Sequence, residues 1–216
     1  CFDNHWEVFD YADLLNFLKK DIDTDYASDE KTFIRHYILF LEEYVEEYKN
    51  LEKNCSRLFK KGLTKEDKFW SRLLNSKIAL EFKNNIEGDF KYVINPGNTS
   101  TPLLNIIPKK WKEIIGQEVL IQFQGNSLKF YLHHANKYSA EKLIKFSKSQ
   151  IQSKKIKFKK ITKRKENSCY ILETKLTDNL NDDFTLKDIF EFLVTFYENI
   201  DNKIIKNYTT FTKYNS

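Results

Sequence analysis

Residues 118–134, EVLIQFQGNSLKFYLHH, decide the fold of this chain. Apolar side chains occupy every second position on either side of a short turn formed by Gly125, Asn126 and Ser127. The alternating apolar positions are Val119, Ile121 and Phe123 before the turn, and Leu128, Phe130 and Leu132 after it. A period of two is typical of strands with one buried face, and a tight turn between two such runs predicts a β-hairpin.

The sequence after the hairpin repeats the same plan. A helical pattern covers residues 139–150, a second alternating pair covers 155–162 and 170–176, and a final long helix follows Thr185, a residue suited to cap it. The resulting order is β-β-α-β-β-α. It predicts an antiparallel sheet of about four strands with both helices packed on one face, which leaves the other face for function.

The sequence before the hairpin reads as helical, because apolar residues recur at steps of three and four. We expect a short helix around residues 14–18, a long one over about 29–53, and a third that starts at Thr64 and is capped together with Asp67. The turn-forming segment 95–102, NPGNTSTP, suggests a boundary between a helical region, 1–94, and an α+β domain with a basic hairpin, 95–216. The fold class predicted is α+β.

Composition excludes several classes of protein. The chain has 216 residues, of which 41% are hydrophobic and 31% charged, and this balance excludes disordered, collagen-like and low-complexity proteins. With only five Gly, phosphate-cradling glycine loops are excluded as well. No apolar run approaches the roughly 20 residues that span a bilayer, so no membrane role is expected. Three widely spaced Cys fit reduced thiols and predict a cytoplasmic protein.

Charge divides the chain in two. Residues 1–53 contain 14 acidic and 6 basic side chains, a net charge of −8, whereas residues 54–216 contain 17 acidic and 30 basic ones, a net charge of +13. The acidic helices therefore suggest a protein partner or a homo-oligomer, and the basic remainder suggests a polyanion.

The basic charge is densest over residues 142–165, which contain eleven Lys or Arg and no acid. Within 154–165, Ile156 and Phe158 alternate with lysines, so one face of a strand is apolar and the other is a positive stripe that can follow phosphates. The predicted nucleic-acid-binding residues are Lys154, Lys155, Lys157, Lys159, Lys160, Lys163, Arg164 and Lys165. The alternative is a solvated edge strand, where lysines oppose aggregation.

Catalytic and metal-binding patterns are weak. Glu81 and Lys83 form an E-x-K tripeptide, which in metal-dependent nucleases places a metal-binding carboxylate and a lysine on one face of a strand. Apolar residues keep a helical step through this tripeptide, so we expect a helix and no catalytic residues there. The adjacent His133 and His134 would face opposite ways on a strand, and no metal site is expected.

Two N-terminal stretches carry a family resemblance: HWEVFDYADLLNFLKKDI (residues 5–22) and DEKTFIRHYILFLEEYVEEY (residues 29–48). With Trp6, Tyr11 and Arg35 at their positions, these stretches resemble the region that follows the catalytic core in a branch of the PD-(D/E)XK nuclease superfamily. The later segment 108–111, PKKW, is similar to the downstream part of such proteins.

The resemblance implies a Mg²⁺-dependent parent hydrolase of a defence or restriction system, whose catalytic Asp and E-x-K precede Cys1. No catalytic residue and no cofactor is then expected in these 216 residues. The leading hypothesis is an accessory region that holds the DNA or RNA backbone. Two alternatives stay open: a protein-interaction module without a nucleic-acid role, and a complete small nuclease that uses Glu81 and Lys83.

Overall fold

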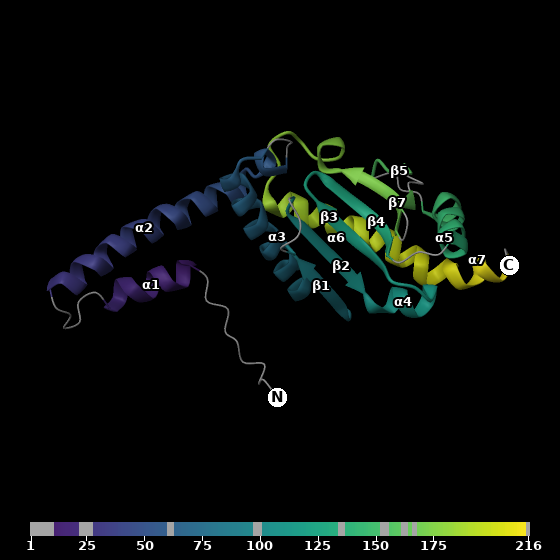
Figure 1. Ribbon diagram of the computed structural model, residues 1–216, viewed down its shortest axis with the longest axis horizontal. Helices are drawn as coiled ribbons and strands as arrows, with labels where there is room; N and C mark the ends of the chain where they lie inside the picture. Colours follow the sequence, from purple (N-terminus) through teal and green to yellow (C-terminus); the bar gives the residue numbers. More distant parts are fainter. Residues whose placement is uncertain are drawn as a thin grey trace, which may run out of the picture. The chain divides into compact units, whose positions relative to one another are not determined.

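A computed structural model describes residues 11–21, 28–59, 63–96, 101–133, 137–151, 156–160, 164–165 and 168–214 (Figure 1). The chain forms two compact units, Cys1–Lys53 and Asn54–Ser216. This division coincides with the change in charge, so the first unit carries the net charge of −8 and the second that of +13. Helices come first and an antiparallel sheet with helices follows, which confirms the α+β class.

The first unit contains a pair of helices, α1 (Tyr11–Asp21) and α2 (Ser28–Lys53), as the apolar periodicity predicts. Their shared core consists of Leu15 from α1 and Ile38, Leu41 and Val45 from α2. The three α2 positions are spaced three and four residues apart and therefore lie on one side of the helix. An ion pair of 2.6 Å between Lys19 Nζ and Glu42 Oε1 joins the two helices at the surface.

The second unit is built on an antiparallel sheet. Its strands are β1 (Phe90–Ile94), β2 (Leu103–Pro108), β3 (Val119–Gln124), β4 (Ser127–His133), β5 (Lys159–Lys160), β6 (Arg164–Lys165) and β7 (Ser168–Lys175). The order is β1-β2-β3-β4-β7-β5, and β6 also pairs with β7. The predicted hairpin is β3–β4. The sheet has seven strands and so exceeds the expected four, chiefly because β1 and β2 extend it on the far side of β3.

The expected boundary between residues 94 and 95 falls inside the second unit, between β1 and β2. Asn95 has a φ of 45° at the end of β1, and its backbone N–H donates to the carbonyl of Leu103 at 2.7 Å. The backbone N–H of Leu103 in turn donates to the side-chain Oδ1 of Asn95 at 3.3 Å. The turn-forming residues thus join two paired strands of one sheet.

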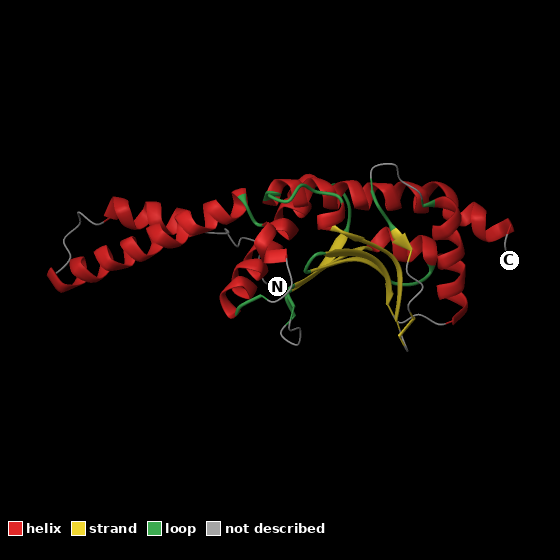
Figure 2. Ribbon diagram, turned by 90° about the horizontal axis from the view of Figure 1, so that it is seen from above, coloured by secondary structure: helices red, strands yellow, loops and turns green. Residues whose placement is uncertain are grey.

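Helices cover one face of this sheet. The main ones are α3 (Lys65–Asn85), α4 (Lys109–Ile115), α5 (Lys137–Gln150) and α6 (Leu186–Lys203). Shorter elements are the 3₁₀ turns η1 (Ser56–Phe59) and η2 (Leu176–Asp178), the π-helical turn η3 (Ile204–Tyr208) and α7 (Thr209–Tyr214). Figure 2 shows the strands as a curved layer with helices of the second unit on its outer side.

Aromatic contacts fix the helices to that face. Ring centroids lie 5.3 Å apart for Phe82 of α3 and Phe90 of β1, and 5.5 Å apart for Trp111 of α4 and Phe130 of β4. Tyr197 of α6 lies 5.6 Å from the Phe90 ring. Because Trp111 and Phe130 are fully buried, the core of the unit lies between these helices and the sheet.

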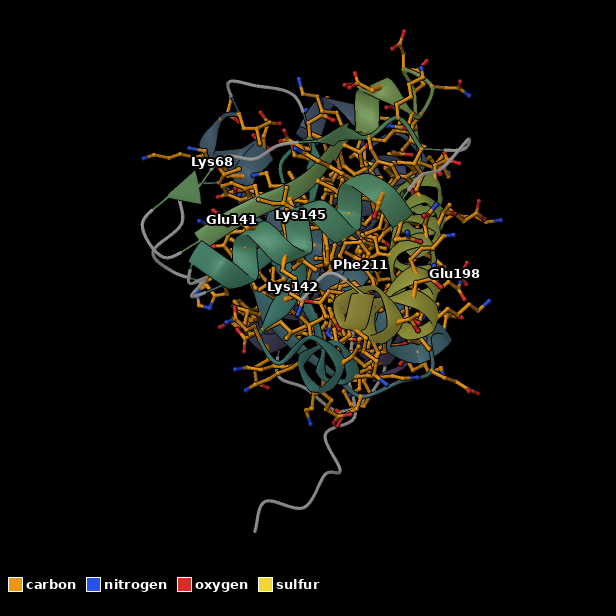
Figure 3. The ribbon with its side chains drawn as sticks, turned by 90° about the vertical axis from the view of Figure 1, so that its right-hand side faces the viewer. Lys68, Glu141, Lys142, Lys145, Glu198 and Phe211 are labelled. Carbon is orange, nitrogen blue, oxygen red and sulfur yellow. The ribbon has the colours of Figure 1, made fainter. Side chains whose placement is uncertain are left out.

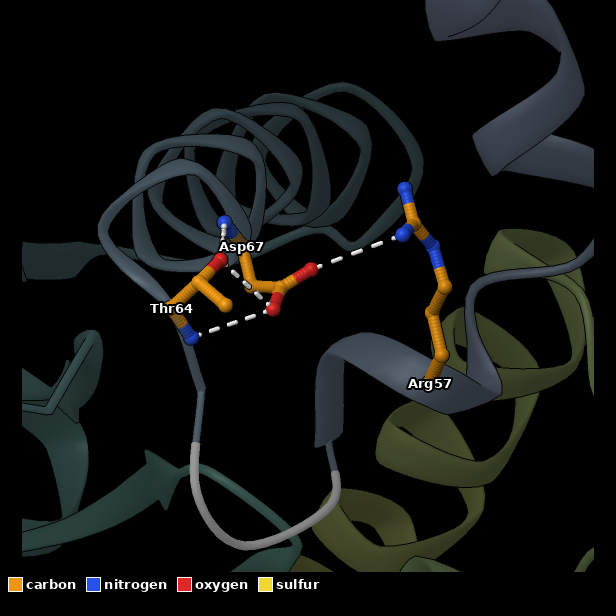
Figure 4. A network of polar contacts seen from close by, with 3 residues as sticks. All are labelled: Arg57, Thr64 and Asp67. Atoms are coloured by element: carbon orange, nitrogen blue, oxygen red, sulfur yellow. Dashed lines mark hydrogen bonds and ion pairs between the residues drawn. The ribbon is translucent and has the colours of Figure 1, made fainter.

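Both predicted threonine caps are confirmed. At the start of α3, Thr64 Oγ1 accepts a hydrogen bond from the backbone N–H of Asp67 at 3.1 Å, and the Asp67 carboxylate accepts one from the Thr64 backbone N–H at 3.1 Å (Figure 4). Arg57 lies 3.6 Å from the same carboxylate. The Thr64 hydroxyl also donates to the Asp67 carboxylate, at 2.8 Å. This bond and the one from the Thr64 backbone N–H, helped by Arg57, lower the pKa of Asp67. Thr185 and Asp188 form the equivalent capping box on α6.

Candidate nucleic-acid interface

The face of the sheet opposite the helices carries a mixture of polar and aromatic side chains, and we call it the second face. Register defines it, because the side chains of paired residues point to the same side. Its members with described side chains on the central strands are Leu103, Asn105, Ile107, Leu120, Gln122, Gln124, Ser127, Lys129, Tyr131, His133, Tyr170, Glu173 and Lys175. Such a composition differs from that of the helix-covered face, which is apolar.

A polar row crosses the second face. The register pairs Asn105 with Gln122, Gln122 with Lys129, and Lys129 with Glu173. Gln122 Nε2 donates to Asn105 Oδ1 at 3.4 Å. Beyond Glu173 the register continues to Lys159 of β5. Hydrogen-bonding amides and charges of both signs therefore stand in line across five neighbouring strands.

An aromatic group lies next to this row. Tyr131 of β4 and Tyr170 of β7 are register partners whose ring centroids are 5.0 Å apart, and we call them the tyrosine pair. The imidazole of His133 lies 6.0 Å from the Tyr131 ring, and Lys129 Nζ lies 5.0 Å from the centre of the Tyr170 ring. Partial burial, with Tyr131 and Glu173 nearby, raises the pKa of Tyr170. Both rings are half-buried, so part of each remains open to solvent.

The predicted basic stripe lies at the edge of the sheet beside β7. Ile156 is buried and the Phe158 ring lies 5.8 Å from Phe196 of α6, whereas Lys157 between them is exposed. The expected strand over 155–162 is wrong at residues 156–158, because the Phe158 backbone N–H donates to the Ile156 carbonyl at 3.1 Å, and β5 begins only at Lys159. The backbone of Lys157 is held on both sides. Its N–H donates to Asn179 Oδ1 at 2.8 Å, and its carbonyl accepts from Thr174 Oγ1 at 3.0 Å.

Two short strands continue this edge. The register pairs Lys159 with Glu173 and Lys160 with Leu172 in β5, and Arg164 with Cys169 and Lys165 with Ser168 in β6. We call exposed Lys157 together with β5 and β6 the basic edge. Three predicted residues, Lys154, Lys155 and Lys163, lie outside the described residues.

The basic run begins on α5. Lys145 and Lys148 are exposed there and Lys142 is half-buried, and Figure 3 shows Lys142 and Lys145 along this helix. The Phe146 ring packs within 5.0 Å of Tyr208 and 5.5 Å of Phe211, which fixes α5 to the C-terminal helical segment. α5 also contacts β7. α5 and the basic edge therefore both adjoin β7.

Glu81 and Lys83 lie on α3, as the helical step predicts. Residues two positions apart on an α-helix point about 200° away from each other, so the two side chains do not share a side. Glu81 instead pairs with Lys77 at 3.4 Å and accepts a hydrogen bond from Asn85 at 3.2 Å. The structure therefore does not bring Glu81 and Lys83 together. A complete small nuclease would need a strand at this tripeptide, whereas the structure has a helix there.

Sequence reasoning did not find the tyrosine pair. Tyr131 lies between buried Phe130 and Leu132, and Tyr170 is followed by buried Ile171, so both tyrosines occupy strand positions where the alternation places polar residues. A large aromatic ring at a strand position that should be polar is the feature of the sequence that could have indicated the pair. Histidine His133 lies 3.4 Å from a carboxylate oxygen of Glu118, and His134 lies outside the described residues.

The described residues contain neither a candidate metal site nor a candidate membrane span. They contain no group of three or more His, Cys, Asp or Glu side chains arranged to hold a metal ion. None of the described helices combines the length and the apolar character needed to cross a membrane.

Comparison with known proteins adds no relative. No family model matches the chain, and no curated protein and no solved structure was found to be similar to it.

Proposed function

We propose that this chain is an accessory region of a PD-(D/E)XK-like, Mg²⁺-dependent nuclease of a defence or restriction system, and that it binds the backbone of nucleic acid. The observation that carries the proposal is the basic edge, where β5 and β6 bring four cationic residues to one strand, β7. The catalytic core and its metal belong to the parent protein, which the proposal places in the cytoplasm.

Electrostatics support a polyanionic partner. The unit that contains the basic edge has a net charge of +13, and residues 142–165 contain no acid that would neutralise their eleven cations. Contacts from lysine and arginine to phosphates release condensed counterions and dominate affinity without reading the sequence. The basic edge would therefore position the substrate for a catalytic core elsewhere.

A triple charge reversal tests this proposal. We expect Lys157→Glu, Lys159→Glu and Arg164→Glu together to abolish binding of a labelled DNA duplex in fluorescence anisotropy. For the unchanged chain we expect log K to fall with log salt with a slope of about −4 to −5, which corresponds to about four to six phosphate contacts.

The matched control is Lys83→Glu, Lys110→Glu and Lys112→Glu, which makes the same change of charge at exposed positions on α3 and α4. This control should keep most of the affinity. Equal losses in both variants would show that net charge alone attracts the duplex, and the absence of binding at low salt would end the proposal.

A second candidate is a protein-interaction module formed by the acidic unit. Large apolar side chains are exposed on its helices: Phe33 is 71% exposed, Leu39 58%, and Phe17 and Phe40 57% each. Along α2 the rings of Phe33, Tyr37 and Phe40 follow one another at centroid distances of 6.4 and 6.3 Å. An exposed apolar patch of this kind marks a contact surface for another protein or a second copy.

A further inference from the structure

We infer that the second face of the sheet binds single-stranded nucleic acid, with an unpaired base stacked on the tyrosine pair and the adjoining phosphates at the basic edge. The inference rests on the proposed function and deepens it, because it names the form of nucleic acid and the side chains that would contact its bases. Neither the predicted basic stripe nor the family resemblance includes Tyr131 or Tyr170.

The tyrosine pair provides the stacking surface. The rings of Tyr131 and Tyr170 are inclined at 43° with centroids 5.0 Å apart, so they form a continuous aromatic patch rather than two isolated side chains. Strand pairing holds both backbones, and buried Leu120 is the register partner of Tyr131 on the other side. A rigid, partly exposed aromatic ring suits a base, since every base has a π-face that can stack on it.

The register brings two residues of the basic edge to second-face positions on either side of Tyr170 along β7. Lys165 of β6 pairs with Ser168, the partner of His133, and Lys159 of β5 pairs with Glu173. Arg164 instead pairs with Cys169, whose partner Leu132 is buried on the helix-covered face. Neighbouring strands are about 5 Å apart, so the strands that contain Lys159 and Lys165 run directly beside β7. Lys129 adds a further cation at the Tyr170 ring.

The polar row offers partners for the edges of a base. An amide side chain can donate and accept hydrogen bonds at the same time. It therefore suits the edge of an unpaired base, which exposes both donors and acceptors. Asn105 and Gln122 of the row provide such groups, and Gln124 of β3 adds another on the same face. The one acid in the row, Glu173, stands between Lys129 and Lys159 in the register, so cations flank it on both sides.

The same features disfavour a duplex as the preferred ligand. In a duplex the faces of the bases are covered by their neighbours in the stack, and an aromatic ring on a sheet cannot reach them without unstacking. The basic edge alone would hold duplex and single strand similarly, because both present phosphates. Preference for a single strand is therefore the property that separates this inference from the proposed function.

The experiment uses the full 216-residue chain and three labelled probes of equal length: an oligothymidylate, an abasic strand with the same phosphates, and a duplex. We expect Tyr131→Leu with Tyr170→Leu to weaken oligothymidylate binding roughly 5- to 150-fold, the range for the loss of one or more stacked bases. The matched control, Tyr131→Phe with Tyr170→Phe, keeps the rings and should bind as the unchanged chain does.

The probes keep the test informative even if the leucine variant does not fold, because the unchanged chain should bind the oligothymidylate more tightly than either the abasic strand or the duplex. Equal affinity for all three probes, or equal affinity of the leucine and phenylalanine variants, would overturn the inference. If binding then still depends on Lys157, Lys159 and Arg164, the proposed function survives alone. If the unchanged chain binds no probe at low salt, both fail.

Discussion

At the scale of single residues, one hydrogen bond in the core of the second unit links two helices. The indole Nε1 of Trp111, on α4, donates to Asp201 Oδ1, on α6, at 2.7 Å. Trp111 is fully buried, and the Tyr197 ring stacks on it at 5.8 Å and 20°. Burial, together with the charge of Asp201 and a hydrogen bond to it, raises the pKa of Tyr197 well above its ordinary value. Asp201 therefore accepts hydrogen bonds from two aromatic side chains.

Removal of this acceptor should destabilise the unit. We expect Asp201→Ala to lower the free energy of unfolding by about 1–3 kcal/mol, because it leaves the buried indole N–H of Trp111 without its acceptor. Asp201→Asn keeps an amide oxygen at that position and should lose less. Urea unfolding followed by tryptophan fluorescence measures both values. An alanine variant as stable as the unchanged chain would show that the hydrogen bond contributes nothing net.

At the scale of single elements, the start of α3 depends on its capping box. We expect Thr64→Ala to lower the free energy of unfolding by about 1 kcal/mol, because the backbone N–H of Asp67 loses its acceptor. Ser76→Ala, at an exposed position within the same helix, is the control and should change little. Chemical denaturation near neutral pH compares the two variants.

The lowered pKa of Asp67 gives this cap a dependence on acid. A carboxyl whose pKa is lower in the folded state stabilises the fold above its ordinary pKa, and this stabilisation is lost as the pH falls through the folded value. The difference in stability between the unchanged chain and Asp67→Asn should therefore shrink below about pH 4, the ordinary value for an aspartate. A difference that stays constant down to pH 2 would contradict this role.

The elements that the sequence predicted are those whose signals are local. The hairpin at residues 118–134 and the helices that start at Thr64 and Thr185 each follow from a pattern within one segment. Strand β2 lacked such a pattern, because side chains on both of its faces are buried and its apolar residues do not alternate. Strands β5 and β6 contain two residues each and exist through their pairing with β7.

The candidate site was predictable in part for the same reason. The basic run is visible in the sequence, because its cations are consecutive or nearly so. The tyrosine pair is not visible there, since Tyr131 and Tyr170 meet only when β4 pairs with β7. To predict a site that is assembled from strands distant in sequence, one must know which residues pair between the strands. The pattern of apolar and polar residues does not give this register.

At the scale of the whole molecule, the separation of charge between the two units has a consequence for association. A unit of net charge −8 with exposed phenylalanines and a unit of net charge +13 are complementary between copies of the chain. We expect the mass measured by light scattering to rise with protein concentration at low salt and to fall when salt is added. Phe33→Ser with Phe40→Ser should reduce the association, whereas Asn16→Ser, at an exposed position of α1, should not. A monomer at every concentration would exclude self-association.

The strand order also implies a sequence of folding events. Strands β1 to β4 are neighbours both in the chain and in the sheet, so each pairing closes only a short loop. β7 joins β4 after a longer excursion that includes α5, and closing a longer loop costs more chain entropy and slows pairing. We therefore expect the four-strand meander to form before β7 pairs with β4. The tyrosine pair and the basic edge both depend on β7, so the proposed binding surface should form only after the meander.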